Sequence, residues 1–559
     1  MAISPTGGEA YSLTSVKEGV TNYKWAPGGK QIAFRAPDTV PAEETQRKKD
    51  KTYVIEVDRN QRVPRLWVQD VPKGTPKVIS PTGQTVVDFS WAPDGRTITY
   101  SASSKPGFFA RYNSTVYTVP ATGGEPRTIV NRPSTNRAAH FSPDGRWIAF
   151  VSSGGSAGMI TAKDLYVVSV DASPDSIRKL TTDAWMGEFT WAPDSRSILY
   201  TTWEPGHGSG EHMFELPIMR VELESGRSEP LTPGPVVNYF MSISDDGTRV
   251  AYKSVESRTV GDVYVTHLAD GKTTRLTDIN PELRQLELGE QKPVSWKSFD
   301  GAEIWGLLLT PPGYEPGKRI PLVVYCHGGP IGGFNYGIFP HFPHIPGQVS
   351  GYPSEAMAGV GIAVLFPMPR GGSGYGVAGY RAIIKSWGET DYKDIMAGVD
   401  AMVERGLADP DRLGVMGASY GGYMTNWIVT QTDRFKAAST GASLSDLAQV
   451  FYHGDAGHFI AEYFGLPWEE AASIAAHSPI TFVANVTTPL LIQHGEKDPR
   501  VPIAQAREFY DALKTLGKNV EFDIYPRGGH VNFEPALERE YMRRNLKWFT
   551  RWLKGDSPE

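Results

Sequence analysis

The sequence has little of what several classes of protein require. It holds one cysteine, Cys326, so an intramolecular disulfide is impossible and a cysteine-based zinc site is not expected. No apolar run approaches the roughly 20 residues that cross a bilayer, which argues against an integral membrane protein. Lysine and arginine number 56 against 62 aspartates and glutamates, giving a net charge of −6. There is no basic excess to hold a phosphate backbone, so we expect no nucleic-acid partner.

The length and composition indicate a globular protein of at least two domains. The chain has 559 residues, against roughly 100–200 residues for a typical domain. Hydrophobic residues make up 40% and charged residues 21%, close to the average of globular proteins. The first residues lack the charged and apolar segments of a signal peptide. As it stands, the sequence predicts a cytoplasmic protein.

The first half contains an internal repeat. An apolar or aromatic residue leads into a turn such as Pro-Asp-Gly, and three or four β-branched or aromatic residues follow. The copies begin at Trp25, Trp91, Phe141, Trp191 and Ile243. The turn residues preset or accept the required φ angles, and the residues after them suit a buried strand. Further strand-like segments bring each unit to four strands in about 50 residues, the blade period of a β-propeller. A β-sandwich with repeated turns is the alternative.

The number of blades is less regular than the repeat. Five whole units are visible, and residues 4–14 are similar to the last half of a sixth. A strand from elsewhere would have to complete this half-blade, or sequence would have to precede Met1, and both explanations stay open. The first unit also carries a charged insertion at 46–51. Such a run favours a solvated surface over a segment that projects across an active site.

The second half alternates strand and helix patterns. Short apolar runs occur at 322–325, 362–366, 412–416, 489–492 and 520–524. Between and after them, apolar residues recur at helical spacing, ending before Gly517 in one case. Buried strands alternating with amphipathic helices predict a mostly parallel, doubly wound sheet.

A possible nucleophile lies between one such strand and one such helix. Gly417-Ala-Ser-Tyr-Gly421 matches the G-x-S-x-G pattern, and Gly154-Gly-Ser-Ala-Gly158 matches it equally well. Only Ser419 follows an apolar strand and precedes a helical stretch, which is the context of a nucleophile elbow in an α/β-hydrolase. Ser156 falls in a turn of the repeat, where glycine and serine are expected anyway. We therefore choose Ser419 as the nucleophile.

The serine requires a base, and the base requires an acid that fixes its tautomer. In this fold the chain order is serine, acid, histidine. Asp498 follows one predicted strand, with Glu496 as a rival two residues earlier, and His530 follows the next strand. The oxyanion requires two N–H donors, one of them from the residue after the nucleophile, Tyr420. The glycine-rich loop after the first strand offers the other donor, Gly329.

At this point the C-terminal half resembles the prolyl oligopeptidase family of serine peptidases. The shared motifs are His327-Gly-Gly-Pro330, Arg370-Gly-Gly-Ser-Gly-Tyr-Gly376, Trp387-Gly-Glu-Thr-Asp391, Gly417-Ala-Ser-Tyr-Gly-Gly422, His494-Gly-Glu-Lys-Asp-Pro-Arg-Val-Pro502 and Gly529-His530. The resemblance implies a triad of Ser419, Asp498 and His530, and so prefers Asp498 to Glu496. It also implies that Arg500 binds a carbonyl group of the substrate.

The resemblance extends to the whole architecture. It implies an N-terminal propeller, which in this family usually has seven or eight blades. The units counted above depart from that number, so we expect about five to seven blades, the first one incomplete, over residues 1–285. An α/β-hydrolase domain follows over residues 286–559. Where other branches carry an oxyanion tyrosine, this chain has His327, which is similar to the acylaminoacyl-peptidase branch and its backbone donor at Gly329.

Substrate specificity is less well defined by the sequence. Five aromatic residues follow the nucleophile region, and they form either a hydrophobic wall for a substrate side chain or ordinary core: Phe451, Tyr452, Phe459, Tyr463 and Phe464. An acidic pair binds the substrate amino group in dipeptidyl peptidases, but Glu43-Glu44 lies in an unremarkable charged insertion. Two histidine pairs have no third ligand in view, so we expect no metal and no cofactor: His341 with His344, and His207 with His212.

The sequence thus predicts a serine peptidase that cuts short peptides through an acyl-enzyme, with the propeller restricting substrate size. A carboxylesterase with secondary peptidase activity is one alternative, because a triad does not distinguish esters from amides. A propeller scaffold with an inert hydrolase domain is another, although the complete triad argues against it. The edge of an unfinished blade can pair with another subunit, so a homo-oligomer is a further hypothesis.

Overall fold

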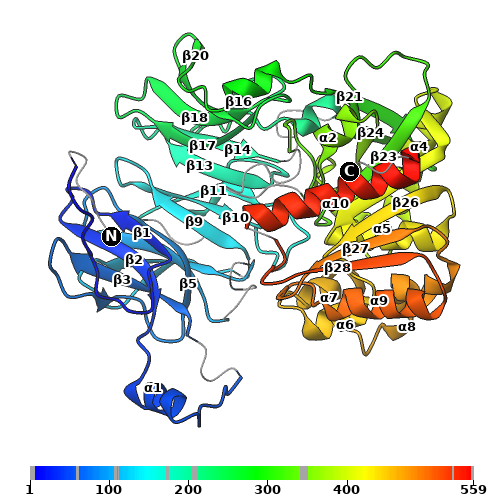
Figure 1. Cartoon of the computed structure of the whole chain (residues 1–559). Helices are drawn as coiled ribbons and strands as arrows, with labels where there is room; N and C mark the ends of the chain where they lie inside the picture. Colours follow the sequence, from blue (N-terminus) through cyan, green and yellow to red (C-terminus); the bar gives the residue numbers. More distant parts are fainter. Residues whose placement is uncertain are drawn as a thin grey trace. The chain divides into compact units, whose positions relative to one another are not determined.

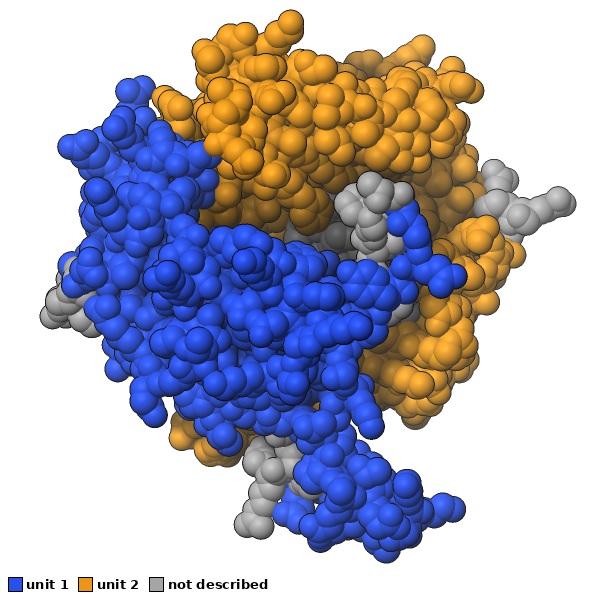
Figure 2. Space-filling model, turned by 90° about the vertical axis from the view of Figure 1, so that its left-hand side faces the viewer, with its two compact units in different colours: residues 1–182, 191–198, 221–227 blue, residues 183–190, 199–220, 228–559 orange. Residues whose placement is uncertain are grey.

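The computed structural model describes residues 7–57, 62–105, 110, 112–132, 134–171, 176–203, 210–339, 351–531 and 534–555. The chain divides into two compact units, shown in two colours in Figure 2. The first comprises residues 1–182, 191–198 and 221–227, and the second comprises residues 183–190, 199–220 and 228–559. The division passes through the fourth of five small sheets.

In the part of the chain that the structure describes, the repeat forms five four-stranded sheets, so the predicted propeller blades are confirmed (Figure 1). In each sheet, strands that are consecutive in the chain are neighbours. The strands are β1 (Asn22–Trp25), β2 (Gln31–Pro37), β3 (Pro64–Asp70), β4 (Lys77–Val78); β5 (Thr85–Trp91), β6 (Thr97–Ser103), β7 (Thr115–Pro120), β8 (Arg127–Val130); β9 (Asn136–Phe141), β10 (Trp147–Ser152), β11 (Asp164–Ser169), β12 (Arg178–Lys179); β13 (Met186–Trp191), β14 (Ser197–Thr202), β15 (Met219–Glu222), β16 (Ser228–Pro230); β17 (Val237–Ile243), β18 (Arg249–Val255), β19 (Asp262–His267) and β20 (Thr273–Arg275).

The repeated tryptophan joins one blade to the blade before it. The indole N–H of Trp91 donates to the backbone oxygen of Lys24 at 3.1 Å, and that of Trp191 donates to His140 at 3.2 Å. Both rings are buried, whereas Trp25, in the first blade, is 46% exposed. The same residue type is therefore a buried link in later blades and a surface residue in the first.

Residues 7–14, the described part of the expected half-blade, pack against the first blade without forming a strand. Leu13 is buried against Ile32 and Phe34. The amide of Gln69 donates to the backbone oxygen of Leu13 at 2.6 Å. The part of the expected half-blade before residue 7 lies outside the described residues.

The charged insertion of the first blade forms a helix, α1 (Ala42–Lys49), that buries none of its residues. Its carboxylates pair with bases one turn later, Glu43 with Arg47 and Glu44 with Lys48. Such pairs on an exposed helix stabilise it only slightly. These contacts support the solvated-surface interpretation of this run.

The second half forms one eight-stranded sheet with the order β21-β22-β24-β23-β25-β26-β27-β28. The pairs β21–β22 and β22–β24 are antiparallel, and all later pairs are parallel. The strands are β21 (Glu290–Lys297), β22 (Glu303–Thr310), β23 (Ile320–Cys326), β24 (Ala363–Met368), β25 (Ala408–Ala418), β26 (Phe435–Gly441), β27 (Leu490–Gly495) and β28 (Val520–Tyr525). This is the predicted doubly wound sheet.

Helices connect these strands, and α10 follows the last of them (Figure 1). They are α2 (Ser354–Gly359), α3 (Gly376–Arg381), α4 (Thr390–Glu404), α5 (Tyr420–Gln431), α6 (Leu447–His453), α7 (His458–Phe464), α8 (Ala471–Ala476), α9 (Ala504–Thr515) and α10 (Pro535–Lys554). The predicted apolar stripes face the core, since Phe509 and Leu513 of α9 and Trp548 and Phe549 of α10 are buried. Because the parallel strands end at one edge, the loops after β23, β25, β27 and β28 come together there.

Candidate active site

Ser419 lies in the tight turn between β25 and α5, at φ 59° and ψ −123°. A positive φ at a residue with a side chain is strained and is typical of a nucleophile elbow. The glycines around it have no space for a side chain. A Cβ at Gly421 would lie 2.0 Å from the backbone oxygen of Cys326, and one at Gly417 would lie 2.6 Å from it. The end of β23 thus packs directly against the elbow.

His530 stands between Ser419 and Asp498. Its Nε2 lies 3.0 Å from Ser419 Oγ, and its Nδ1 lies 2.8 Å from Asp498 Oδ2. Ser419 and Asp498 follow β25 and β27, and His530 follows β28, so the parallel sheet brings together residues separated by as many as 111 positions. These are the distances over which a serine, a base and an orienting acid exchange and hold protons.

The carboxylate of Asp498 is buried and well supplied with donors. Its Oδ1 accepts hydrogen bonds from the backbone N–H groups of Arg500 at 2.8 Å and Val501 at 3.0 Å. Burial by itself raises the pKa of Asp498, but hydrogen bonds from His494 and His530 outweigh it and hold the pKa well below its usual range. Asp498 is therefore a permanent anion at the histidine ring.

The two rivals considered from the sequence lie elsewhere. Glu496 is exposed, and its carboxylate accepts the backbone N–H of Arg527 at 3.3 Å. Ser156 lies in an exposed loop after β10, where its backbone oxygen accepts a hydrogen bond from Ser153. Neither side chain makes a contact of the kind that joins Ser419, His530 and Asp498.

The predicted oxyanion donors lie on the two segments that meet at the elbow. Tyr420 begins α5, where a backbone N–H has no partner within the helix. Gly329, at φ 142°, lies in the loop after β23. A Cβ at Gly421 would be 2.9 Å from the backbone oxygen of His327, which places this loop against the elbow. The structure thus brings the two donor segments together.

His327 is buried under the same loop. Its Nδ1 lies 2.8 Å from the backbone oxygen of Gly328, to which an Nδ1–H donates. Burial lowers the pKa of His327 to about 4. The ring is therefore neutral near pH 7 and is engaged with its own loop.

Sequence reasoning missed a residue that lies beneath the elbow. The hydroxyl of Tyr420 donates to Asp391, which is completely buried at the start of α4. Burial raises the pKa of Asp391 to about 7, although hydrogen bonds from Tyr420 and Tyr392 oppose that rise. Asp391 belongs to the Trp387-Gly-Glu-Thr-Asp391 motif, which the sequence analysis singled out. Nothing in the sequence indicated that its carboxylate binds Tyr420.

Arg500 is already engaged in an ion pair. Its guanidinium binds the carboxylate of Asp455, which lies between α6 and α7. The backbone N–H of Asp455 also donates to Pro499 at 2.8 Å. The connection between the two helices is thus fastened to the loop that carries Asp498.

The five aromatic residues after β26 divide into two groups. Tyr463 and Phe464 are buried around Trp387, with ring centroids 4.9 and 5.6 Å from it, and Phe459 is 5.7 Å away. Tyr463 and Phe464 are core, and Phe459 is half-buried against the same indole ring. Phe451 is half-buried and Tyr452 is 56% exposed. Phe451 and Tyr452 contact each other on α6, close to Asp455, so they are the two that stay candidates for a substrate wall.

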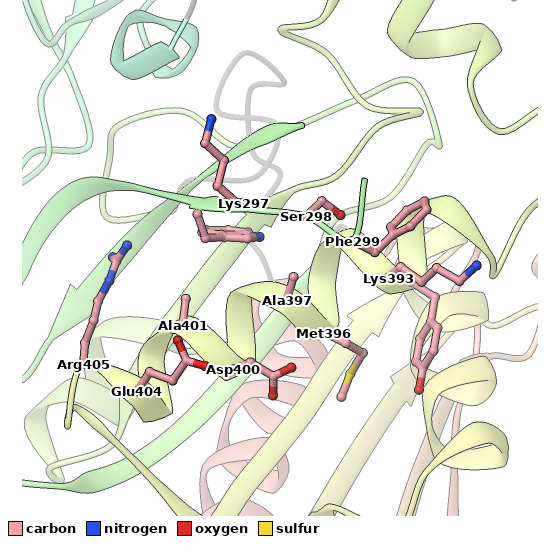
Figure 3. Close-up of a pocket in the computed structure, with 12 residues that line it drawn as sticks. Lys297, Ser298, Phe299, Lys393, Met396, Ala397, Asp400, Ala401, Glu404 and Arg405 are labelled. Carbon is pink, nitrogen blue, oxygen red and sulfur yellow. The ribbon is translucent and has the colours of Figure 1, made fainter. Parts of the chain in front are cut away.

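A cleft of about 560 Å³ lies between β21 and α4. Figure 3 shows charged side chains of both signs at its rim, among them Lys297, Asp400 and Arg405. None of the sequence-predicted site residues lines it, so it is separate from the arrangement around Ser419.

Within the described ranges, no three side chains of histidine, cysteine, aspartate or glutamate gather as metal ligands do. His212 pairs with Glu215, whereas His207, His341 and His344 lie outside the described residues. None of the helices in the described part of the chain combines the length and apolar character that spanning a membrane requires.

Comparison with known structures shows the same fold. An acylaminoacyl peptidase of Pyrococcus horikoshii matches with a TM-score of 0.79 at 22% identity, over 99% of this chain and 84% of that one. A puromycin hydrolase matches with a TM-score of 0.73 at 19% identity, over 99% and 82% of the two chains. The predicted combination of a β-propeller and an α/β-hydrolase domain is confirmed.

Comparison by sequence finds peptidases. A dipeptidyl-peptidase 5 of Porphyromonas endodontalis is 24% identical over 99% of this chain and 82% of its own length. An uncharacterised peptidase of Bacillus subtilis, YuxL, is 35% identical over half of this chain, which spans 41% of that relative. A model of the prolyl oligopeptidase family matches residues 349–556. Residues 349–556, which hold the elbow and the loops after β27 and β28, therefore match the prolyl oligopeptidase family.

Proposed function

We propose that this chain is a serine peptidase that hydrolyses short peptides through an acyl-enzyme, with Ser419, His530 and Asp498 as its catalytic triad. The observation that carries the proposal is the position of His530, with Nε2 3.0 Å from Ser419 and Nδ1 2.8 Å from Asp498. The match of residues 349–556 to the prolyl oligopeptidase family supports it. So do the names of the relatives, which are peptidases.

In the first half-reaction Ser419 Oγ attacks the carbonyl carbon of the substrate while His530 Nε2 accepts the hydroxyl proton. The anionic Asp498 holds the Nδ1–H side of the ring and stabilises the imidazolium that forms. The oxyanion accepts hydrogen bonds from the backbone N–H groups of Tyr420 and Gly329. Loss of one such donor typically lowers kcat by about 10²–10³-fold.

The tetrahedral intermediate then collapses. The bond to the leaving nitrogen breaks, and His530 returns its proton to the departing amine, leaving an ester on Ser419. Water attacks this ester with His530 again as base, and the acid product and free Ser419 result. Every proton that His530 accepts is returned, so the cycle consumes only water and peptide. No metal or cofactor takes part in this scheme.

Four narrower expectations are part of the same proposal. The propeller restricts access to short peptides, and the boundary between the two domains lies between residues 285 and 286, where β20 has ended and β21 has not begun. Arg500 binds a substrate carbonyl, with Phe451 and Tyr452 beside it. The location is cytoplasmic, which suits a chain whose single cysteine, Cys326, is buried as a free thiol.

We further propose that the chain forms homo-oligomers through its first blade. Tyr23 and Trp25 on β1 are 62% and 46% exposed, whereas the equivalent Trp91 and Trp191 are 8% and 6% exposed under the preceding blade. Burying such aromatic surface favours association. Light scattering of the chain and of Trp25→Glu tests this: a smaller mass for the variant supports the proposal, and a monomeric parent chain contradicts it.

The catalytic proposal is tested by comparing the purified chain with Ser419→Ala. The panel contains acetyl-aminoacyl, free-amino dipeptidyl and internally quenched peptides, together with short-chain esters. We expect peptide hydrolysis that falls by on the order of 10⁶-fold in the variant. Unchanged activity in Ser419→Ala would contradict the assignment of the nucleophile.

The same panel separates the alternatives. Rapid ester hydrolysis with little peptide cleavage identifies a carboxylesterase. A properly folded chain that is inert toward all substrates and toward a fluorophosphonate probe is the result that a scaffold with an inactive hydrolase domain predicts.

A further inference from the structure

A cavity of about 210 Å³ lies beside the loop that follows β23. Its wall is formed mainly by large apolar side chains and by the backbone of two glycines: Trp185, Trp203, Met213, Phe334, Met368 and Gly332-Gly333. All of these residues belong to the second compact unit. The polar side chains at the wall, Asn335 and Ser373, are neutral, and none of the described lining residues is charged.

The aromatic walls are fixed by contacts behind them. Trp185 packs edge-on against Tyr380, with ring centroids 5.6 Å apart. Trp203 packs against Tyr239, with ring centroids 6.2 Å apart. Because each indole rests on a buried tyrosine, the cavity is formed before any ligand enters and requires little ordering on binding.

The far wall is held in the same way. The backbone oxygen of Phe214 accepts the side-chain amide of Asn335 at 3.3 Å and the backbone N–H of Tyr336 at 3.2 Å. Phe334 packs edge-on against His327, with ring centroids 5.6 Å apart. These contacts fasten the segment after β23 to Met213 and its neighbours.

The cavity is close to the proposed site of reaction. Ile331, which lines it, is two residues after Gly329, the proposed oxyanion donor. Successive Cα atoms are about 3.8 Å apart, so these two residues are at most about 7.6 Å apart. A peptide whose carbonyl oxygen is bound at Gly329 therefore places the side chain of a residue next to the scissile bond within reach of the cavity.

We propose that this cavity is a specificity pocket for one aromatic side chain of the substrate, adjacent to the bond that is cut. The proposal rests on the proposed peptidase function and narrows its substrate class. The size fits, because a cavity of roughly 150 Å³ with apolar walls holds benzene. Two indoles and two methionine sulfurs offer the ring-to-ring and sulfur-to-ring contacts that aromatic groups favour. A charged side chain would enter without a counter-ion and lose its hydration.

The test compares peptides that carry phenylalanine or alanine at each position flanking the scissile bond. For the parent chain we expect one position at which phenylalanine gives at least about 10-fold higher kcat/KM, equivalent to about 1.4 kcal/mol. Trp203→Ala should abolish that preference while leaving the alanine peptide and a short ester unaffected. Trp203→Phe, which keeps an aromatic wall, should retain most of it.

Two results overturn the proposal: a phenylalanine preference that Trp203→Ala leaves unchanged, or equal losses for the phenylalanine and alanine peptides. Ester hydrolysis that depends on Ser419 keeps these outcomes separate from a failure of the proposed function.

A binding measurement covers the case in which the chain does not cleave peptides. Ligand-observed NMR should detect acetyl-phenylalanine amide bound to the parent chain, more strongly than acetyl-alanine amide and not to Trp203→Ala. Equal signals for the two amides, or for the chain and its variant, contradict the pocket assignment without any use of activity.

Discussion

The hydroxyl of Tyr420, the residue after the proposed nucleophile, donates a hydrogen bond to the buried carboxylate of Asp391. The two residues are 29 positions apart in the chain. The ring of Tyr420 also packs edge-on against Trp387, with centroids 4.9 Å apart. The side chain of Tyr420 is thus anchored from below, next to the backbone N–H that we propose as an oxyanion donor.

Replacing Tyr420 with phenylalanine should therefore affect both stability and turnover. Tyr420→Phe leaves Asp391 buried without this donor, which typically costs about 1–3 kcal/mol. We expect a lower urea midpoint, and a kcat reduced more than KM is changed, because the anchor positions a group that acts in the transition state. Urea unfolding and steady-state kinetics measure the two effects.

The neighbouring Tyr423 provides the matched control. It lies on the same helix, its ring stacks on Tyr420 at 5.6 Å, and its hydroxyl donates to the backbone oxygen of His477 at 3.0 Å. Tyr423→Phe should lower stability with kcat preserved. Equal changes of kcat in both variants would show that Asp391 has no specific role at the elbow.

The elbow should not tolerate a methyl group at Gly421. Its Cβ would lie 2.0 Å from the backbone oxygen of Cys326, and neither backbone can move without disturbing β23. We expect Gly421→Ala to lose activity and to destabilise the fold by several kcal/mol, since overpacking of a core costs about 1–3 kcal/mol or more. Gly359→Ala, where nothing lies within 4 Å, should leave the unfolding midpoint and the activity intact.

Arg500 should contribute to substrate binding through its side chain and to the triad only through its backbone. Arg500→Ala keeps the backbone N–H that binds Asp498, so we expect kcat to change little. KM for peptides should rise by about 10-fold or more, because the substrate loses one hydrogen bond from a charged donor. Hydrolysis of a short ester should be unaffected.

Asp455→Asn distinguishes this role from a purely structural ion pair. It removes the charge that holds Arg500, so KM for peptides should stay the same or fall. If both variants instead lower stability alike and leave KM unchanged, Arg500 serves only to fasten α6 and α7 to the loop that carries Asp498.

Stability should fall as the pH rises from about 4.5 to about 7, partly because of Glu538. Burial raises the pKa of this carboxyl from 4.5 to about 7, so the folded state holds its proton more tightly than the unfolded state. The contribution is complete below the unfolded pKa and is lost as the pH passes the folded one. Glu538→Gln should stabilise the chain at pH 8 by about 1 kcal/mol or more and have little effect at pH 4.

Thermal unfolding of the two proteins at pH 4 and pH 8 checks this. Burial also raises the pKa of Asp391 to about 7. The stability of Glu538→Gln should therefore still fall with rising pH, but less steeply than that of the parent chain. An identical difference between the two proteins at both pH values would contradict the assignment to Glu538.

The sequence determined the features that depend on local chemistry. The turns that start at Trp25, Trp91 and Trp191 predicted the blades, because turn residues and the β-branched residues after them act within a few positions. The elbow at Ser419 was predicted for the same reason, from a strand, a glycine-rich turn and a helix in immediate succession. The order of acid and histidine after later strands also followed from the sequence, since parallel strands end at one edge.

Contacts between distant residues were decided only by the tertiary structure. The sequence left Asp498 and Glu496 open until the family resemblance favoured one, and the loop after β27 turns Asp498 inward to His530 and Glu496 outward to Arg527. The ion pair between Arg500 and Asp455, separated by 45 residues, has no local signature.

The same limit applies to burial. Tyr452 and Tyr463 look alike in the sequence, yet one is 56% exposed and the other 1%. Burial depends on which elements pack over a side chain, and those elements come from remote parts of the chain. A short motif specifies its own backbone, whereas the partner of a side chain is specified only when the whole sheet and its helices have assembled.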